Sequence, residues 1–164
     1  MKAAVILSLM LLSVMSMTAK DITYRELPNS TVTNMNRQRA FVASFAERHK
    51  LGLKVTRTKT DYDLLELILS KKLIKKDQAW ELQALGVVFG DALISEGPKL
   101  RWMEVTDAWG TDPALLFGGT TYQLNPVTMI QKRVQDREDQ PFVRALAKTV
   151  LGLVREEAAK SPKR

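Results

Sequence analysis

Apolar residues follow several patterns along the chain, and the first pattern is a nearly continuous apolar run over 3–15. Lys2 precedes this run, and the small residues Ser16, Thr18 and Ala19 follow it. That order is typical of a cleavable secretory signal peptide, and the run is shorter than a membrane-spanning helix needs. An uncleaved anchor and a buried helix are the alternatives. We expect a signal peptide over 1–19 and a periplasmic or secreted protein after its cleavage.

Apolar residues three and four positions apart predict helices in the N-terminal half of the chain. The first predicted helix covers 34–50, with Asn34 as its cap. The second covers 60–76, and its acidic first turn and lysine-rich last turn suit the helix dipole. The third covers 78–96 and is apolar on nearly every side, so we expect it at the centre of the domain. Alternating residues over 51–55 indicate a further short strand.

The C-terminal half combines helices with segments of alternating polarity that predict strands. Such strands are expected over 100–106, 114–117 and 120–124. Gly118 and Gly119 separate the last two strands and predict a two-residue hairpin turn. Asn125 and Pro126 are favoured residues for the cap and first position of a helix, and a last helix is predicted over 140–160.

Length and composition add a single domain held by ordinary packing to this picture. The 164 residues include no cysteine, which excludes disulfides, thiolate metal sites and a cysteine nucleophile. We therefore predict one α+β domain over 20–164, with helices packed on a small three-stranded antiparallel sheet. The net charge of +7 is concentrated in 48–76, where nine lysines and arginines face three acidic residues. One face of the domain should therefore be basic.

A set of spaced residues within the predicted core 77–137 carries a family resemblance. These residues are Trp80, Leu85-Gly86, Gly90-Asp91, Trp102-x-x-Val105-x-Asp107, Gly110-x-Asp112-Pro113-Ala114-Leu115 and Pro126-x-x-Met129-Ile130-x-Lys132-Arg133. Over 80–137 the chain resembles the bacterial family catalogued as domain of unknown function 3806. The resemblance implies a compact α+β domain and no established activity, and it leaves the flanking helices 34–50, 60–76 and 140–160 outside.

The residues that could perform catalysis are few. His49 is the only histidine, and no serine lies in a Gly-x-Ser-x-Gly setting, so a serine–histidine mechanism is disfavoured. Asp91 interrupts an apolar helix and must be paired or protonated if buried. One hypothesis makes Asp91 a general acid or base beside Glu104 or Asp107. The other makes it the structural partner of Arg133 or of backbone amides.

The loop after the strand predicted over 100–106 could form a binding surface instead of a catalytic site. The candidate residues are Asp107, Trp109, Asp112, Tyr122 and Arg133, together with the basic Lys71 and Lys72. Trp109 lies in a loop that contains Gly110, which makes it the best candidate for an exposed aromatic platform. The two aspartates around it lack the spacing of a calcium loop and suit turn formation, so we expect no metal and no cofactor.

These observations favour an exported, non-enzymatic binding protein for a protein or cell-envelope partner, of which an immunity-type inhibitor is one form. The alternative is a carboxylate-based hydrolase acting on envelope glycan, and a third hypothesis is a structural accessory domain. The predicted export argues against nucleic acid, as does the lack of aromatics interleaved with the basic residues of 48–76, where Tyr62 is the single aromatic residue. The same basic segment allows a weak contact with an anionic membrane surface.

Overall fold

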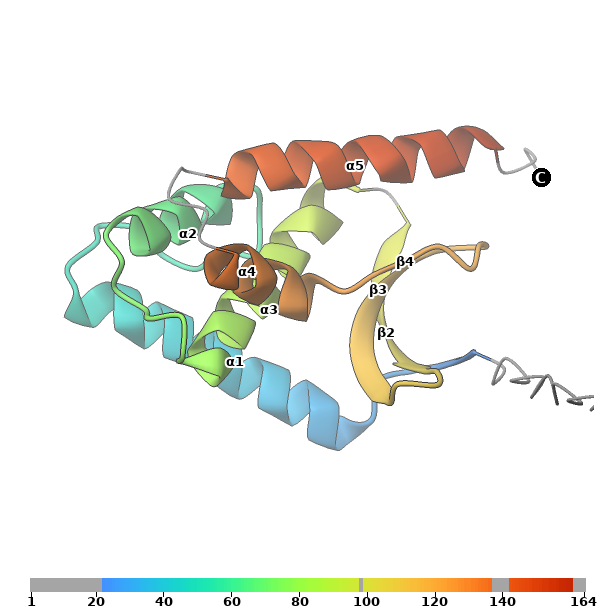
Figure 1. Ribbon diagram of the computed structural model, residues 1–164, viewed down its shortest axis with the longest axis horizontal. Helices are drawn as coiled ribbons and strands as arrows, with labels where there is room; N and C mark the ends of the chain where they lie inside the picture. Colours follow the sequence, from blue (N-terminus) through green and yellow to red (C-terminus); the bar gives the residue numbers. More distant parts are fainter. Residues whose placement is uncertain (1–21, 98, 137–141, 161–164) are drawn as a thin grey trace, which may run out of the picture.

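The structure is a computed structural model that describes residues 22–97, 99–136 and 142–160 (Figure 1). The signal peptide predicted over 1–19 lies outside the described residues, as do the first two residues of the predicted last helix. Within the described ranges, no helix is long and apolar enough to cross a membrane.

The described part of the chain forms five helices, close to those that the periodicity predicts. They are α1 (Asn29–Arg48), α2 (Asp61–Ser70), α3 (Ala79–Glu96), α4 (Pro126–Gln135) and α5 (Val143–Lys160). The helix α1 begins earlier than expected because Pro28, rather than Asn34, stands at its N-cap. Asn125 and Pro126 start α4 as predicted. In α5, Leu153 is 45% exposed although it is apolar.

The C-terminal end of α2 differs from the prediction. The helix stops at Ser70, so Lys71, Lys72 and the following lysines lie beyond its last turn. Lys72 has a left-handed φ of 52°, and the amide of Leu73 donates to the carbonyl of Ile68 while that of Lys72 donates to Leu69. This is the Schellman arrangement, in which glycine usually occupies the left-handed position. A lysine there gives no sequence signal for the end of the helix.

The sheet contains four antiparallel strands in the order β1-β2-β3-β4, one more than predicted. The strands are β1 (Thr23–Arg25), β2 (Leu100–Thr106), β3 (Thr111–Phe117) and β4 (Gln123–Leu124). The additional strand β1 pairs with β2 through Tyr24 opposite Val105. Gly118 and Gly119 do not form a two-residue turn, because the amide of Phe117 donates to the carbonyl of Tyr122 across a longer loop. The segment 51–55 contains no strand.

The helix α3 forms the centre of the domain, as its apolar sequence predicts. It contacts α1, α2, α4, α5 and the strand β2. Figure 1 shows α1 and α5 on opposite sides of α3, with the sheet beside the helices. One face of the sheet joins this core through Leu100, Leu115, Phe117 and Leu124. The α+β class and the single domain are therefore confirmed.

Candidate functional site

Asp91, in the middle of α3, lies within a buried hydrogen-bonded cluster. Its side chain is 2% exposed, and the guanidinium of Arg39 on α1 binds both carboxylate oxygens at 2.6 and 2.8 Å. The indole Nε1 of Trp102 donates to Oδ1 at 2.9 Å, and Nε of Arg57 lies 3.3 Å from Oδ2. We call Asp91, Arg39, Arg57 and Trp102 the Asp91 cluster. Asp91 is thus a paired charge, with Arg39 rather than the predicted Arg133 as its main partner.

A second buried carboxylate, that of Asp61, binds the backbone of Arg57, which is a member of this cluster. Asp61, at the start of α2, is fully buried and accepts hydrogen bonds from the amides of Thr56 and Arg57, both at 2.8 Å. These bonds fix Arg57 in a left-handed backbone conformation with φ 59°, from which its side chain reaches Asp91. The two carboxylates therefore join the loop before α2 to α3.

Glu104 is also committed to an ion pair. It lies on β2, is 6% exposed, and pairs with Arg25 on the neighbouring strand β1. Asp107 is used in a different way, because its Oδ1 accepts the amides of Trp109 at 2.7 Å and Gly110 at 3.2 Å. The hydrolase hypothesis pairs Asp107 with Asp91 or Glu104, and neither described cavity is lined by Asp107 together with one of these residues.

The turn that Asp107 organises projects Trp109 into solvent. The carbonyl of Gly110 accepts the Asp107 amide at 2.9 Å, and Gly110 has a φ of 150°, which glycine adopts most readily. The turn is therefore closed by backbone and side-chain hydrogen bonds on both sides. Trp109, held in the middle of it, is 95% exposed. A fixed turn with an exposed indole at its tip is a ready contact surface.

Beside this turn lies a groove of about 630 Å³. It is bounded by the N-terminal half of α1, by the start of α4 and by the β2–β3 turn, and we call it the α1–α4 groove. Its lining is mostly polar and comprises Ser30, Thr31, Asn34, Met35, Gln38, Gln83, Asp107, Trp109, Asp112, Pro113, Asn125, Val127, Thr128 and Lys132. A groove of this size is typical of small-molecule or oligomer binding sites.

The groove unites part of the predicted binding surface and separates the rest. Asp107, Trp109 and Asp112 line it together, whereas Tyr122 and Arg133 do not. Tyr122 faces α5 instead, and its pKa is raised by burial and by the nearby Glu157 and Glu156 carboxylates. On α4, Lys132 rather than the adjacent Arg133 lines the groove, because neighbouring helix positions point in different directions.

The basic residues Lys71 and Lys72 are exposed and do not line the groove. They follow α2, which Figure 1 shows at the end of the molecule away from the β2–β3 turn. The binding surface proposed from the sequence is therefore two separate surfaces: a polar groove and a basic patch.

The α1 wall of the groove was not predicted. Ser30, Asn34 and Gln38 are four residues apart, a spacing that places them along one face of a helix. A polar stripe of this kind was the available sequence signal. The helix expected over 34–50 does not include Ser30, so the stripe is not complete until the helix is extended to Asn29.

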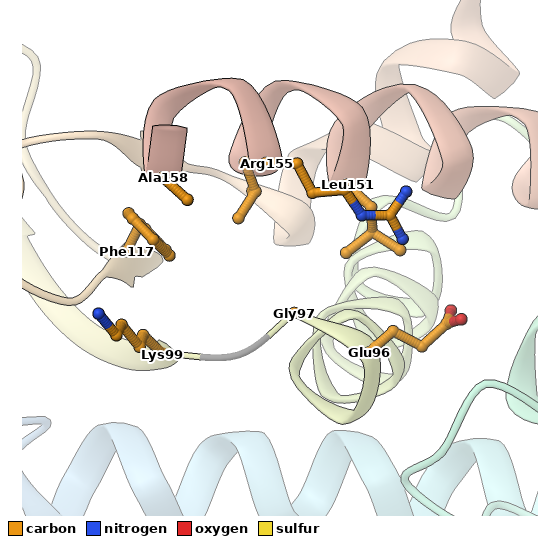
Figure 2. Close-up of a pocket in the computed structure, with 8 residues that line it drawn as sticks. Glu96, Gly97, Lys99, Phe117, Leu151, Arg155 and Ala158 are labelled. Atoms are coloured by element: carbon orange, nitrogen blue, oxygen red, sulfur yellow. The ribbon is translucent and has the colours of Figure 1, made fainter. Parts of the chain in front are cut away.

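A second, smaller cavity of about 110 Å³ lies under α5 (Figure 2). Its apolar lining includes Phe117, Leu151, Val154 and Ala158, and charged side chains of Glu96, Lys99 and Arg155 stand at its edge. No residue of the predicted site lines it. Among the described residues, no three histidine, aspartate or glutamate side chains lie close enough to hold a metal ion.

The fold and the groove define a small α+β domain whose helices cover one face of an antiparallel sheet. A solved structure from Bacteroides thetaiotaomicron VPI-5482 has a similar fold, with a TM-score of 0.70 and 15% identity. The similarity covers 80% of this chain and 48% of that one, so the chain spans about half the length of that protein. No curated protein matches the chain.

The family described as Domain of unknown function (DUF3806) matches residues 61–144, and the chain belongs to this family. The resemblance found over 80–137 is thereby confirmed. The match is wider than predicted, because it begins with α2, which the prediction had left outside the family segment. Most of the groove lies inside the match, whereas α1 lies before it.

Proposed function

We propose that this chain is an exported binding protein that holds a protein or cell-envelope partner in the α1–α4 groove without catalysing a reaction. The observation that carries the proposal is Trp109, an indole 95% exposed at the rim of a groove of about 630 Å³. Large exposed aromatic side chains are rare on surfaces that contact only water and are enriched where proteins bind partners. An immunity-type inhibitor would use the same groove for a protein partner.

The ion pairs formed by the buried carboxylates favour a binding role over hydrolysis. Asp91 and Glu104 are both held by arginines, and neither lines the groove. A general acid must be able to give its proton to the substrate. The Asp91 carboxylate is held by a bidentate guanidinium and an indole donor and does not line the groove, so it is not placed to protonate a ligand there.

One observation keeps hydrolysis as a second candidate function. Asp107 and Asp112 both line the groove, so two carboxylates face one space. Two carboxylates flanking a glycosidic bond are the usual requirement for glycoside hydrolysis. Incubation of the protein with peptidoglycan tests this candidate, since release of fragments by the protein and its loss in Asp112→Asn would support it. No release at any pH between about 4 and 9 excludes it.

Replacing Trp109 with alanine is expected to abolish partner binding while leaving the fold unchanged. Because the side chain is almost fully exposed, the free energy of unfolding should change by less than about 0.5 kcal/mol. Recovery of the protein's partner from a cell-envelope extract should fall by about tenfold or more. Thermal unfolding and pull-down, performed on the same preparation, measure the two effects.

The double variant Lys71→Glu, Lys72→Glu is the control, because it alters exposed residues outside the groove. We expect this variant to recover the partner as the unaltered protein does. If the lysine variant loses the partner and Trp109→Ala keeps it, the basic patch is the binding surface and the groove is not.

A further inference from the structure

We infer that the ligand of the α1–α4 groove is a neutral glycan, bound through its hydroxyl groups and stacked on Trp109. This inference rests on the proposed binding function and adds the chemical class of the ligand. Four features carry it: the amide and hydroxyl side chains of the lining, the availability of the Gln38 amide, the small net charge of the lining, and the exposed indole.

The polar lining of the groove is matched to hydroxyl groups. It offers four side-chain amides, on Asn34, Gln38, Gln83 and Asn125, and three hydroxyls, on Ser30, Thr31 and Thr128. A side-chain amide presents a donor and an acceptor at fixed separation, and a sugar hydroxyl is itself both donor and acceptor. Each amide can therefore donate to one hydroxyl of a sugar ring and accept from its neighbour. A lysine can only donate and a carboxylate can only accept, so neither matches two adjacent hydroxyls in this way.

Gln38 adds a further amide to this wall. The residue is 3% exposed and lines the groove. In the described part of the chain, its amide forms no hydrogen bond, whereas the amide of Gln83 already contacts Gln131 at 3.4 Å. The amide of Gln38 is therefore available to hydrogen-bond a polar ligand in the groove in place of solvent.

The charges of the groove disfavour a strongly charged ligand. The charged side chains of its lining are Asp107, Asp112 and Lys132, so two carboxylates face one lysine and the formal charge is −1. Polyanions such as nucleic acid need a surplus of lysine and arginine, which the groove lacks. A cationic peptide needs several carboxylates, and the surplus here is a single one, while Asp107 already accepts two backbone amides of its own turn.

Trp109 supplies the apolar half of glycan recognition. A sugar ring presents C–H groups on its faces and hydroxyls around its edge, so it can pack on an indole while its edge meets amides. The rest of the lining has few apolar side chains, namely Met35, Pro113 and Val127, and Met35 is itself 1% exposed. A protein segment that binds by burying side chains would require deeper apolar pockets than these.

Calorimetric titration of the purified protein tests the inference with three probes: short linear oligosaccharides of glucose, of mannose and of N-acetylglucosamine. A lysine hexapeptide and inorganic polyphosphate are the charged comparisons. We expect at least one oligosaccharide to bind, with an affinity that changes less than about twofold between about 0.05 M and about 0.5 M salt, because a neutral ligand is not screened.

The variants locate the binding in the groove. Trp109→Ala should weaken oligosaccharide binding by about tenfold or more, and Asn34→Ala by about threefold to tenfold. Thr33→Ala is the matched control, since this exposed α1 residue adjoins Asn34 but does not line the groove, and its affinity should be unchanged. Gln38→Met keeps the side-chain length but removes the amide, so it should also weaken binding. If this variant does not fold, the variants at the exposed residues Trp109 and Asn34 still test the inference.

Three results would overturn the inference: no oligosaccharide binds, binding survives both Trp109→Ala and Asn34→Ala, or binding falls steeply with salt. Binding of the lysine peptide that Trp109→Ala abolishes would refute the glycan class but leave the proposed binding function standing. The envelope pull-down decides that function independently, because it does not presuppose any ligand class.

Discussion

The variant Asp91→Ala is expected to lose about 3–5 kcal/mol of unfolding free energy. The loss arises because Arg39, whose side chain is 14% exposed, remains buried with no counter-charge when the carboxylate is removed. The indole N–H of Trp102 loses its acceptor in the same step. Arg57 contributes little to the loss, since its side chain is 63% exposed and can turn to water. Chemical denaturation measures the loss as a lower midpoint concentration of denaturant. The slope of the unfolding free energy against denaturant concentration should stay the same as in the unaltered protein.

Two further variants separate the cost of an unpaired charge from the value of the ion pair. The double variant Asp91→Leu, Arg39→Met removes both charges. It should recover most of the stability that Asp91→Ala loses, because a buried ion pair contributes about as much stability as apolar residues of similar size in its place. Asp63→Ala removes a carboxylate that pairs with Arg144 at the surface, where both side chains are more than half exposed. It should cost less than about 1 kcal/mol. Equal losses in Asp91→Ala and Asp63→Ala would contradict the role given to Asp91.

The variant Gly86→Ala is expected to destabilise the protein by about 3 kcal/mol, near the upper end of the usual cost of overpacking. A Cβ at Gly86 would lie 2.5 Å from the carbonyl oxygen of Val127 and 2.6 Å from that of Pro126. Both contacts are with the backbone of α4, which cannot move aside as a flexible side chain can. The helices α3 and α4 would have to separate, and the lining of the groove by α4 would shift with them.

Gly152→Ala provides the matched control, because the same change is made within a helix and meets no atom within 4 Å. There the only expected effect is the better helix propensity of alanine, a gain of about 0.5–1 kcal/mol. Thermal unfolding of the two variants should therefore shift in opposite directions. A Gly86→Ala protein that is as stable as Gly152→Ala would show that α3 and α4 do not pack as closely as described.

The elements that the sequence predicts well are those whose signals are local. The apolar α3, the alternating β2 and the Asn125–Pro126 start of α4 each depend on neighbouring residues alone, and each is confirmed. The strand β1 could not be predicted in this way. Its three residues show no useful periodicity, and it becomes a strand because β2 offers it an open edge.

The site was predictable only where it is made of one loop. Asp107, Trp109 and Asp112 are close in sequence, and turn chemistry places them together. The partner of Asp91 is 52 positions away, and periodicity gives the inward face of a helix without giving its neighbour. Arg133 and Arg39 were therefore equally compatible with the sequence, and the packing of α1 on α3 selects Arg39.

The Asp91 cluster also bears on where this chain can be divided into fragments. Both arginines that neutralise Asp91 precede residue 61, where the family match begins, and so do β1 and the α1 wall of the groove. A fragment limited to residues 61–144 would contain Asp91 without its two arginine partners, and its sheet would lack β1. The segment that the family match covers is thus smaller than the packed domain of this chain. A fusion protein that carries the domain must therefore also include α1.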